Sequence, residues 1–318
     1  MIVTALYSID ELAIDRRATF SAAGYAAARP TYPASLFRTV LSYHHAQSDQ
    51  GALLDLGCGH GLIAREMSPH FAKVVGLDTS AGMVKQAAST TDDPKVSFRQ
   101  GGAEDLSFLA DRSVDMVVAG QSAHWFDYAR AWPELARVVK PGGSLAFWGY
   151  KDNVLVGHPR ANRIFDHFCY ADGSDVAAPG VEGMNAYWEQ PGRNKVRNLL
   201  REVTPPAAEW RDVRRVLCDV GSEVSAEELP DAETAWMRKR INLGQLEAYV
   251  RTFSAFQGWK DAHPEARSRV DGGDGDLADV LMDRIVASEP RWSAMGDAWR
   301  DAEVETVWGT YILMAKRR

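Results

Sequence analysis

Most of the evidence for the architecture of this chain comes from one segment, Leu54-Asp55-Leu56-Gly57-Cys58-Gly59-His60-Gly61. An apolar run precedes it, and residues 62–68, which have helical periodicity, follow it. Glycine adopts positive φ and leaves the backbone open, so a glycine-rich turn between a strand and a helix is a typical ligand site. We expect Gly57 to make the tight turn, Gly59 to let a ligand lie against the backbone, and Gly61 to let the helix pack closely on the strand.

Outward from this turn, short apolar runs alternate with helical segments as far as Tyr150, which is the pattern of parallel strands joined by crossover helices. The expected strands are residues 52–56, 73–77, 96–98, 114–119 and 144–148. A helix should end before Pro141-Gly142-Gly143, where the chain turns into the next strand. This half is predicted to be α/β.

After Tyr150 strand-like runs become rare until residues 304–314, so a mostly helical region is expected. The candidate helices are residues 161–170, 195–203, 243–256 and 277–288. The Gly/Asp-rich tract 271–276 lacks the ligand spacing of an EF-hand and is interpreted as a surface turn. Arg238-Lys239-Arg240 is interpreted as a solvated face. The predicted organisation is an N-terminal helical segment (1–50), an α/β core (51–150), a mainly helical cap with part of the sheet (151–302) and a returning C-terminal strand (303–318).

Composition limits the classes of function. The 318 residues are 46% hydrophobic and 25% charged, with a net charge of −7, which argues against general nucleic-acid binding. Cys58, Cys169 and Cys218 are far apart and form no CxxC pair, so neither disulfides nor a zinc site is expected. No export signal is evident, and no apolar run approaches the roughly 18–20 residues that span a bilayer. We expect a cytoplasmic protein without a metal, and the sequence leaves its oligomeric state open.

Asp78 ends the second expected strand, where a carboxylate can accept hydrogen bonds from both hydroxyls of a ribose. The glycine spacing G-x-G-x-G differs from the G-x-G-x-x-G of dinucleotide folds, which makes a nicotinamide-dependent oxidoreductase the weakest alternative. The two features together predict a nucleoside-containing ligand. The structural alternative is that Asp78 only caps the following helix.

With this order of motifs the chain resembles the class I S-adenosylmethionine-dependent methyltransferases. The resemblance implies a Rossmann-like, mostly parallel sheet whose last strand is antiparallel, a mainly helical cap, and S-adenosylmethionine as cofactor. The residues that it implies for cofactor binding are Tyr25, Arg29, Asp55, Gly57, Gly59, Gly61, Asp78, Thr79, Met83, Ala103, Glu104 and Gln121. Among these, Glu104 has an alternative role as a solvated helix-start acid, and Tyr25 as a packing residue.

Five further segments resemble those of fungal trans-aconitate methyltransferases. They are Ala28-Arg29-Pro30-Thr31-Tyr32-Pro33, Ala123-His124-Trp125-Phe126-Asp127, Trp148-Gly149-Tyr150, Tyr187-Trp188-Glu189-Gln190-Pro191-Gly192-Arg193 and Tyr249-Val250-Arg251-Thr252. The resemblance implies esterification of one carboxylate of a small polycarboxylic acid.

The chemistry of carboxyl methylation sets what the acceptor site needs. A carboxylate is ionised at neutral pH, so it requires no general base, and in-line placement in a dry pocket should provide most of the acceleration. Arginine can hold an unreacting carboxylate in a bidentate pair, which makes Arg193 and Arg251 the chief candidates. The expected acceptor walls are Trp125, Tyr187, Trp188 and Gln190, with His124 and Tyr150 as positioning residues at the reaction centre. Packing alone is the alternative for the aromatic residues and for His124, and an exposed helical position is the alternative for Arg251.

Two other functions remain open. One is an N-, S- or O-methyltransferase of a fungal secondary metabolite, for which a neutral acceptor would need a base and His124 is the candidate. The other is a non-catalytic S-adenosylmethionine-binding module.

Overall fold

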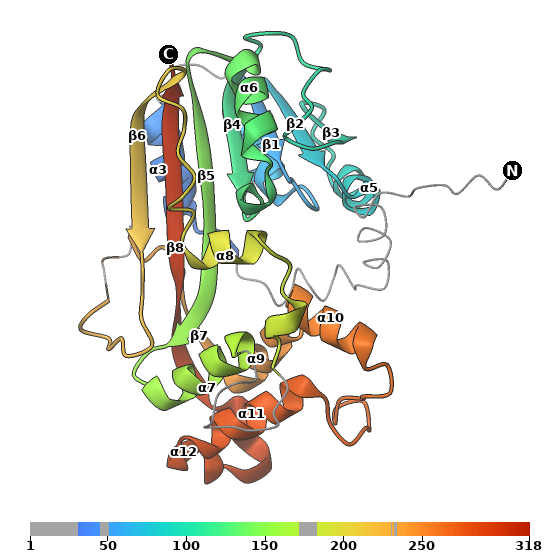
Figure 1. Ribbon diagram of the computed structural model, residues 1–318, viewed down its shortest axis with the longest axis vertical. Coiled ribbons are helices and arrows are strands. Elements are labelled where there is room, and N and C mark those ends of the chain that lie inside the picture. The colour runs from blue at the N-terminus through green and yellow to red at the C-terminus, as the bar shows by residue number, and fades with distance from the viewer. Residues whose placement is uncertain (1–30, 45–50, 172–182, 230, 232–233) are drawn as a thin grey trace, which may run out of the picture.

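The computed structural model describes residues 31–44, 51–171, 183–229, 231 and 234–318. One eight-stranded sheet runs through these residues in the order β3-β2-β1-β4-β5-β8-β6, and β7 also pairs with β8 (Figure 1). The strands are β1 (Ala52–Leu56), β2 (Lys73–Asp78), β3 (Val96–Gln100), β4 (Val114–Gly120), β5 (Val139–Leu155), β6 (Trp210–Cys218), β7 (Arg238–Asn242) and β8 (Glu303–Arg317). The α-helices are α3 (Ala34–His44), α4 (Leu62–Met67), α5 (Ala81–Ser89), α6 (Tyr128–Val138), α7 (Pro159–Tyr170), α8 (Gly192–Arg197), α9 (Leu243–Val250), α10 (Ser254–Ala262), α11 (Leu277–Ala287) and α12 (Pro290–Ser293).

The sheet has a parallel part and an antiparallel part. Strands β3, β2, β1, β4 and β5 are parallel neighbours, whereas β8 is antiparallel to β5, β6 and β7. This arrangement confirms the predicted fold class. Parallel strands end at one edge of the sheet, so the turns after β1, β2 and β4 meet there, as the glycine turn and Asp78 require.

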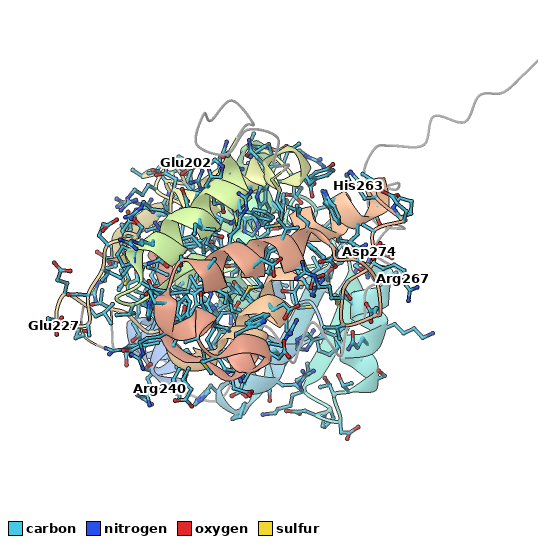
Figure 2. All side chains as sticks on the ribbon, turned by 90° about the horizontal axis from the view of Figure 1, so that it is seen from below. Glu202, Glu227, Arg240, His263, Arg267 and Asp274 are labelled. Atoms are coloured by element: carbon cyan, nitrogen blue, oxygen red, sulfur yellow. The ribbon has the colours of Figure 1, made fainter. Side chains whose placement is uncertain are left out.

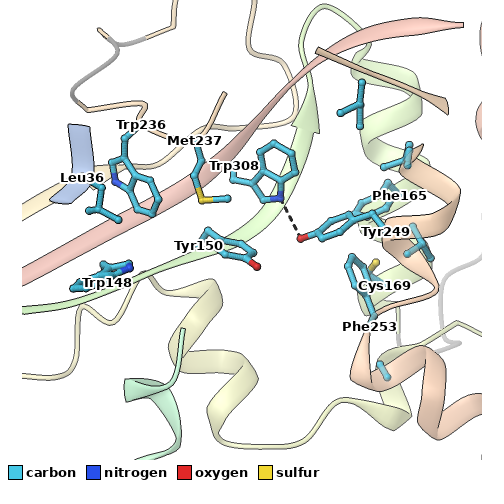
Figure 3. Close-up of a cluster of buried hydrophobic side chains, with 14 of the residues drawn as sticks. Leu36, Trp148, Tyr150, Phe165, Cys169, Trp236, Met237, Tyr249, Phe253 and Trp308 are labelled. Atoms are coloured by element: carbon cyan, nitrogen blue, oxygen red, sulfur yellow. Dashed lines mark hydrogen bonds between the residues drawn. The ribbon is translucent and has the colours of Figure 1, made fainter. Parts of the chain in front are cut away.

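Helices cover both faces of the sheet. Leu36 of α3 and Ala64 of α4 pack on one face, and Leu135 of α6 packs on the other. The apolar core under α3 and α4 continues into the cap. Phe165 and Tyr249 of the cap belong to the same cluster of buried side chains (Figure 3). Figure 3 also shows the Trp308 indole N–H donating to the Tyr249 hydroxyl at 3.1 Å.

The cap lies at the end of the sheet where the parallel strands finish, and it contains α7, α9, α10, α11 and α12 (Figure 1). Figure 2 looks at it from below, with the helices stacked across the end of the sheet. Strand β5 crosses the expected core–cap boundary at residue 150 and pairs with β8 on both sides of it. The core and the cap therefore share two long strands.

The first half of the chain matches the expectation closely. All five predicted strands are present, and α6 ends directly before β5. The one difference is that β5 begins earlier and contains Pro141-Gly142-Gly143, with an irregular register opposite residues 114–116. The local turn is accommodated inside the strand as a bulge.

The second half contains two strands that the prediction missed, β6 and β7. The sequence of β6, Trp-Arg-Asp-Val-Arg-Arg-Val-Leu-Cys, has neither a continuous apolar run nor a clean alternation, because this strand lies at the sheet edge with four of its nine residues exposed and three half-buried. In β7 the residues of the charged triplet 238–240 are exposed, as expected, but they lie on a strand.

Two predicted helices differ from those observed. Residues 243–256 form two helices, α9 and α10, because Phe253 between them is extended. Helix α8 begins at Gly192 and ends at Arg197, short of the predicted 195–203. Leu199 and Leu200 have φ of 53° and 54°, a left-handed conformation that an α-helix cannot contain.

Candidate cofactor and acceptor site

The three glycines of the first turn have positive φ but different surroundings. A Cβ on Gly57 would lie 2.3 Å from the Cβ of Ser122, so Gly57 is needed where the turn touches the end of β4. A Cβ on Gly61 would lie 2.8 Å from the Phe98 ring, so this glycine brings the start of α4 against β3. Among the residues that the structure describes, a Cβ on Gly59 would meet nothing within 4 Å. Gly59 is therefore the position at which the backbone faces open space.

Asp78 ties the ends of β1 and β2 together. Its Oδ2 accepts a hydrogen bond from the Gly59 amide at 2.8 Å, and its Oδ1 accepts one from the Ser80 amide at 2.9 Å. The N-cap of α5 is Ser80, whose hydroxyl accepts from the Met83 amide. Capping is thus not the role of Asp78, and this half-buried carboxylate still has lone pairs for further donors.

Asp55 lies at the end of β1 and is fully buried, and within the described part of the chain neither of its carboxylate oxygens has a hydrogen-bond partner of good geometry. Burial raises the pKa of Asp55 to about 7, the neighbouring charge of Asp78 raises it further, and the Ala64 amide dipole offsets part of this rise. A buried carboxyl group without a partner is rare and indicates a site that is incomplete without a ligand.

The ends of the other strands complete this side of the site. Ala103 is buried, Thr79 is exposed and Met83 is half-buried. The Glu104 carboxylate accepts from the Asp127 amide at 2.9 Å, which joins the segment after β3 to the start of α6. The Gln121 amide brackets the backbone of Tyr150, donating to its carbonyl at 2.9 Å and accepting from its N–H at 2.8 Å.

His124 and Trp125 form a short 3₁₀ turn directly after β4. The His124 ring is buried, and its Nδ1 has no partner. Burial, with the nearby charges of Arg193 and Lys195, lowers the pKa of His124 to about 3, so the imidazole is neutral at physiological pH. Trp125 is 45% exposed, and a Cβ on Gly192 would lie 2.3 Å from its ring. This contact places the start of α8 against the turn.

Arg193 lies one residue into α8 and reaches the same region. Its guanidinium pairs with Asp152 and contacts the Tyr170 hydroxyl, and it lies 3.9 Å from the centre of the Trp188 ring. Its Nε is buried without a partner. The guanidinium is therefore partly neutralised by one carboxylate and still has an unused donor.

The other expected wall residues divide into two groups. Trp188 is buried beside Arg193, and its indole N–H donates to the Cys169 carbonyl at 2.8 Å. Tyr187 packs on α10, close to Gly258, and Gln190 is exposed and accepts from the Asn194 amide at 3.3 Å. Trp188 is thus the wall residue that contacts the Arg193 guanidinium.

Arg251 lies elsewhere, at the end of α9. It pairs with Glu247 at 2.9 Å, with Asp279 at 3.3 Å and with Asp276, and all three of these acids are buried. This network neutralises Arg251 and ties α9 to α11. Its environment gives a structural explanation for Arg251 that does not involve an acceptor.

Asp276, the last residue of the Gly/Asp-rich tract, caps α11 in a capping box with Asp279. No group of acids, histidines or cysteines within the described part of the chain has the arrangement of a metal site. Cys58, Cys169 and Cys218 are buried and unpaired with one another. Tyr25, Arg29 and most of the expected segment 1–50 lie outside the described residues.

Comparison with known proteins identifies the family. A family model described as a methyltransferase domain matches residues 54–147. A methyltransferase of Claviceps purpurea is 33% identical over 314 residues, covering 92% of this chain and 90% of that protein. The chain belongs to the methyltransferase family. CRG1 of Saccharomyces cerevisiae, a "probable S-adenosylmethionine-dependent methyltransferase", is 26% identical over 275 residues, covering 84% of this chain and 87% of that protein.

The fold of this methyltransferase also resembles a solved structure, a candidate type II methyltransferase of Anaeromyxobacter dehalogenans. The TM-score is 0.59 at 23% sequence identity, and the match covers 91% of this chain and 97% of that one. The enzyme is a class I methyltransferase, and its cofactor is S-adenosylmethionine. None of the three relatives described here has trans-aconitate in its name, so that resemblance stays a prediction.

The geometry of the methyltransferase fits its cofactor on three counts. Gly59 faces open space, the Asp78 carboxylate beside it has spare acceptor capacity, and the buried Asp55 carboxyl lacks a partner. Asp78 would hold the ribose, and the glycine turn would lie along the methionine part. The cofactor supplies the methyl group as a sulfonium electrophile, and the protein's residues hold both reactants in place.

Sequence reasoning missed several residues of this region. Ser122 closes the glycine turn from β4, donating to the Leu56 carbonyl at 2.6 Å. Asp152, Tyr170 and Lys195 surround Arg193 and His124. The signal for Ser122 was its position directly after Gln121 at a strand end, but nothing local in the sequence indicates that Asp152 and Tyr170 meet Arg193.

A cavity of about 1050 Å³ is lined by Asp152 and Tyr170 among others. It is bounded by β5, α7, α8 and the chain after β6, and residues of both charges line it. The described part of the chain contains no helix with the length and apolar character of a membrane span.

Proposed function

We propose that this methyltransferase esterifies a carboxylate of a small organic acid. The proposal rests chiefly on the surroundings of His124. Because its pKa is lowered to about 3, His124 would be a weak base at neutral pH, whereas Arg193 and Lys195 make the region electropositive. An acceptor that is already ionised matches both properties, since it needs no base and is attracted by the two cations.

In this proposal the Arg193 guanidinium orients the acid, and His124, Trp125 and Trp188 exclude water around the reacting oxygen. The oxygen would attack the methyl carbon in line with the C–S bond, whose electron pair stays on sulfur. Dilution of charge in this transition state makes placement and dryness the main sources of acceleration.

Trans-aconitate-like polycarboxylates belong to this class and are the substrate suggested by the sequence resemblance. The structure supports a modified expectation, because Arg251 is engaged by three buried acids and Arg193 is partly engaged by Asp152. Because Arg193 is the candidate arginine that remains on the acceptor side among the described residues, we propose an acid with few unreacting carboxylates.

The test is incubation with isotope-labelled S-adenosylmethionine and a panel of acids, followed by mass analysis. The panel contains trans-aconitate, cis-aconitate, citrate, isocitrate, itaconate and benzoate. We expect a methyl ester that alkali hydrolyses. If no acid is esterified while an amine, a thiol or a phenol added to the same panel is methylated, the proposal is wrong.

The role of Arg193 has a matched control on the same helix. Arg193→Gln should raise the KM for the acid at least tenfold, with cofactor affinity changed less than twofold, because a charge-assisted hydrogen bond is lost. Arg197→Gln, at an exposed position one turn along α8, should leave KM within twofold. Equal effects of the two substitutions would contradict a specific role for Arg193.

A second candidate is methylation of an aromatic hydroxyl. The exposed Trp125 ring, and a large cavity lined by the Arg193 partners Asp152 and Tyr170, favour a larger aromatic acceptor. The dependence of kcat/KM on pH distinguishes the two. A carboxylate should give a flat profile between pH 6 and 8.5, apart from any effect of cofactor binding, whereas a phenol should give a rate that rises with pH.

A further inference from the structure

Among the described residues the buried carboxyl group of Asp55 has no side-chain partner, and the Ala64 amide of α4 offsets only part of the effect of its burial. Strand β1 is central, and Asp55 pairs in register with Gly76 of β2 and Val118 of β4. Neither oxygen has a hydrogen-bond partner of good geometry in the part of the chain that the structure describes, and the side chain is fully buried. A residue that only filled this space would be apolar, because an unsatisfied buried carboxyl group destabilises the folded state.

The groups that face Asp55 bring no positive charge. The end of β2 contributes the Asp78 carboxylate, the glycine turn contributes the Cys58 thiol, and α4 contributes the Ala64 amide. Strands β2 and β4 present Gly76 and Val118. Arg65, the cation closest in sequence, is turned away and donates to the His60 carbonyl and the Thr91 hydroxyl. Among the described residues, the local field is therefore negative.

The cofactor changes charge during the reaction. S-adenosylmethionine has a positive sulfonium, a positive ammonium and a negative carboxylate, for a net charge of +1. When the methyl group leaves, the electron pair of the C–S bond stays on sulfur, and the thioether product has a net charge of zero. A negative charge near the glycine turn would therefore favour the donor over the product.

We propose that Asp55 gives up a proton when S-adenosylmethionine binds, and that the resulting carboxylate lets the enzyme bind the cationic donor more tightly than the neutral product. After transfer the sulfonium charge is gone, Asp55 takes its proton back, and the product is released more easily. The proposal depends on the cofactor alone, so it stands or falls independently of the acceptor.

The free-state protonation of Asp55 supports this step. With a pKa of about 7, the group holds about three quarters of a proton at pH 6.5. A nearby cation lowers the pKa of a carboxyl group, so binding of the donor should displace that fraction. Donor affinity should then rise about fivefold between pH 6 and pH 7, since the competing protonation is removed.

The test is titration calorimetry on the wild-type protein at pH 6.5, in two buffers of different ionisation enthalpy. We expect the donor to release roughly 0.5–0.8 proton and S-adenosylhomocysteine to release less than half of that. The α-amino group, which both ligands share, is almost fully charged at this pH and contributes little. Equal release by the two ligands, or none by the donor, would overturn the proposal.

Two variants identify the residue that releases the proton when the donor binds. Asp55→Asn should abolish the release and bring the affinities for donor and product closer together, whereas His60→Gln should keep both properties. His60 is the control because it lies in the same turn, is half-buried and is itself titratable, with a pKa that burial and the charge of Arg65 lower. Loss of the linkage in His60→Gln instead would assign it to the histidine and contradict the proposal. The wild-type measurement decides the matter if Asp55→Asn fails to fold.

Discussion

Gly57 and Gly59 show how two residues of one type differ at the scale of single atoms. Both have positive φ, but Gly57 is packed against Ser122 whereas Gly59 faces open space beside Asp78. The first glycine is required by the protein's own packing. Gly59 leaves room for the cofactor. One glycine of the turn therefore serves stability and another serves binding.

A substitution at Gly59 should therefore affect binding more than folding. Gly59→Ala places a methyl group in the open space and should weaken S-adenosylmethionine binding at least tenfold by calorimetry. The positive φ should also cost about 1–2 kcal/mol of stability. Gly142→Ala is the matched control, since Gly142 has φ of 82° and nothing within 4 Å, but lies at the opposite end of β5. Equal affinities for the two variants would show that Gly59 does not face the cofactor.

The buried carboxyl group of Asp55 should also appear in the pH dependence of stability. Its pKa is about 7 in the folded state and about 3.9 when unfolded, so the folded state holds the proton more tightly between these values. Its contribution is fully present below pH 4 and is lost as pH rises to 7, by up to about 4 kcal/mol. Relative to Asp55→Asn, the wild type should lose stability over this range in urea denaturation. A constant difference from pH 4 to pH 8 would contradict the raised pKa.

At the scale of elements, the cap is held together by ion pairs as well as by apolar contacts. Arg251 joins α9 to α11 through Glu247, Asp276 and Asp279, and Arg300 donates to Glu247 at 2.8 Å. The network is local to the cap helices. Arg193 lies instead at the start of α8, which the contact between Gly192 and Trp125 places against the turn after β4. Two arginines that look equivalent in the sequence therefore serve different elements.

Removing Arg251 should lower the free energy of unfolding and leave acceptor binding largely unchanged. Arg251→Met leaves three buried acids without their main counter-charge, which should cost about 3–5 kcal/mol in denaturant unfolding. Arg163→Met, which breaks an exposed pair with Glu223, should cost less than about 1 kcal/mol. A large rise in the KM for the acceptor, with stability unchanged, would instead restore Arg251 as an acceptor-binding residue.

At the scale of the whole molecule, β5 and β8 unite the core and the cap. The two strands pair from Ser144 with Lys316 to Leu155 with Thr306, and the apolar cluster on one face continues from α3 to α11. Neither part can lose its structure without exposing strands and side chains of the other. We therefore expect the described residues to unfold as one cooperative unit.

Unfolding should accordingly show a single transition. Far-UV circular dichroism and tryptophan fluorescence should give the same midpoint in urea. S-adenosylmethionine at a hundredfold excess over its dissociation constant should raise the stability of the whole unit by about 2.7 kcal/mol. Two separated transitions, with only one moved by the cofactor, would show that core and cap unfold independently.

Local sequence reasoning succeeded where short-range chemistry decides the structure. The glycine turn, Asp78 and the strands from β1 to β5 were predictable, because buried parallel strands are continuous apolar runs and each is bounded by turn residues. Strand β6 was missed because an exposed edge strand has no such run. The break between α9 and α10 was missed because Phe253 is extended for tertiary packing, where it contacts Tyr249 and Trp188.

The α/β class, the glycine turn between β1 and α4, and the kind of ligand that this turn can hold follow from local sequence, since they depend on contacts within a few residues. Three other features required the folded chain: the contact of Arg193 with Asp152 and Tyr170, the pairing of Arg251 with three acids, and the burial of Asp55 without a partner among the described residues. These properties depend on segments that are far apart in the chain and on exclusion of water, and both arise only when the sheet and the cap pack together.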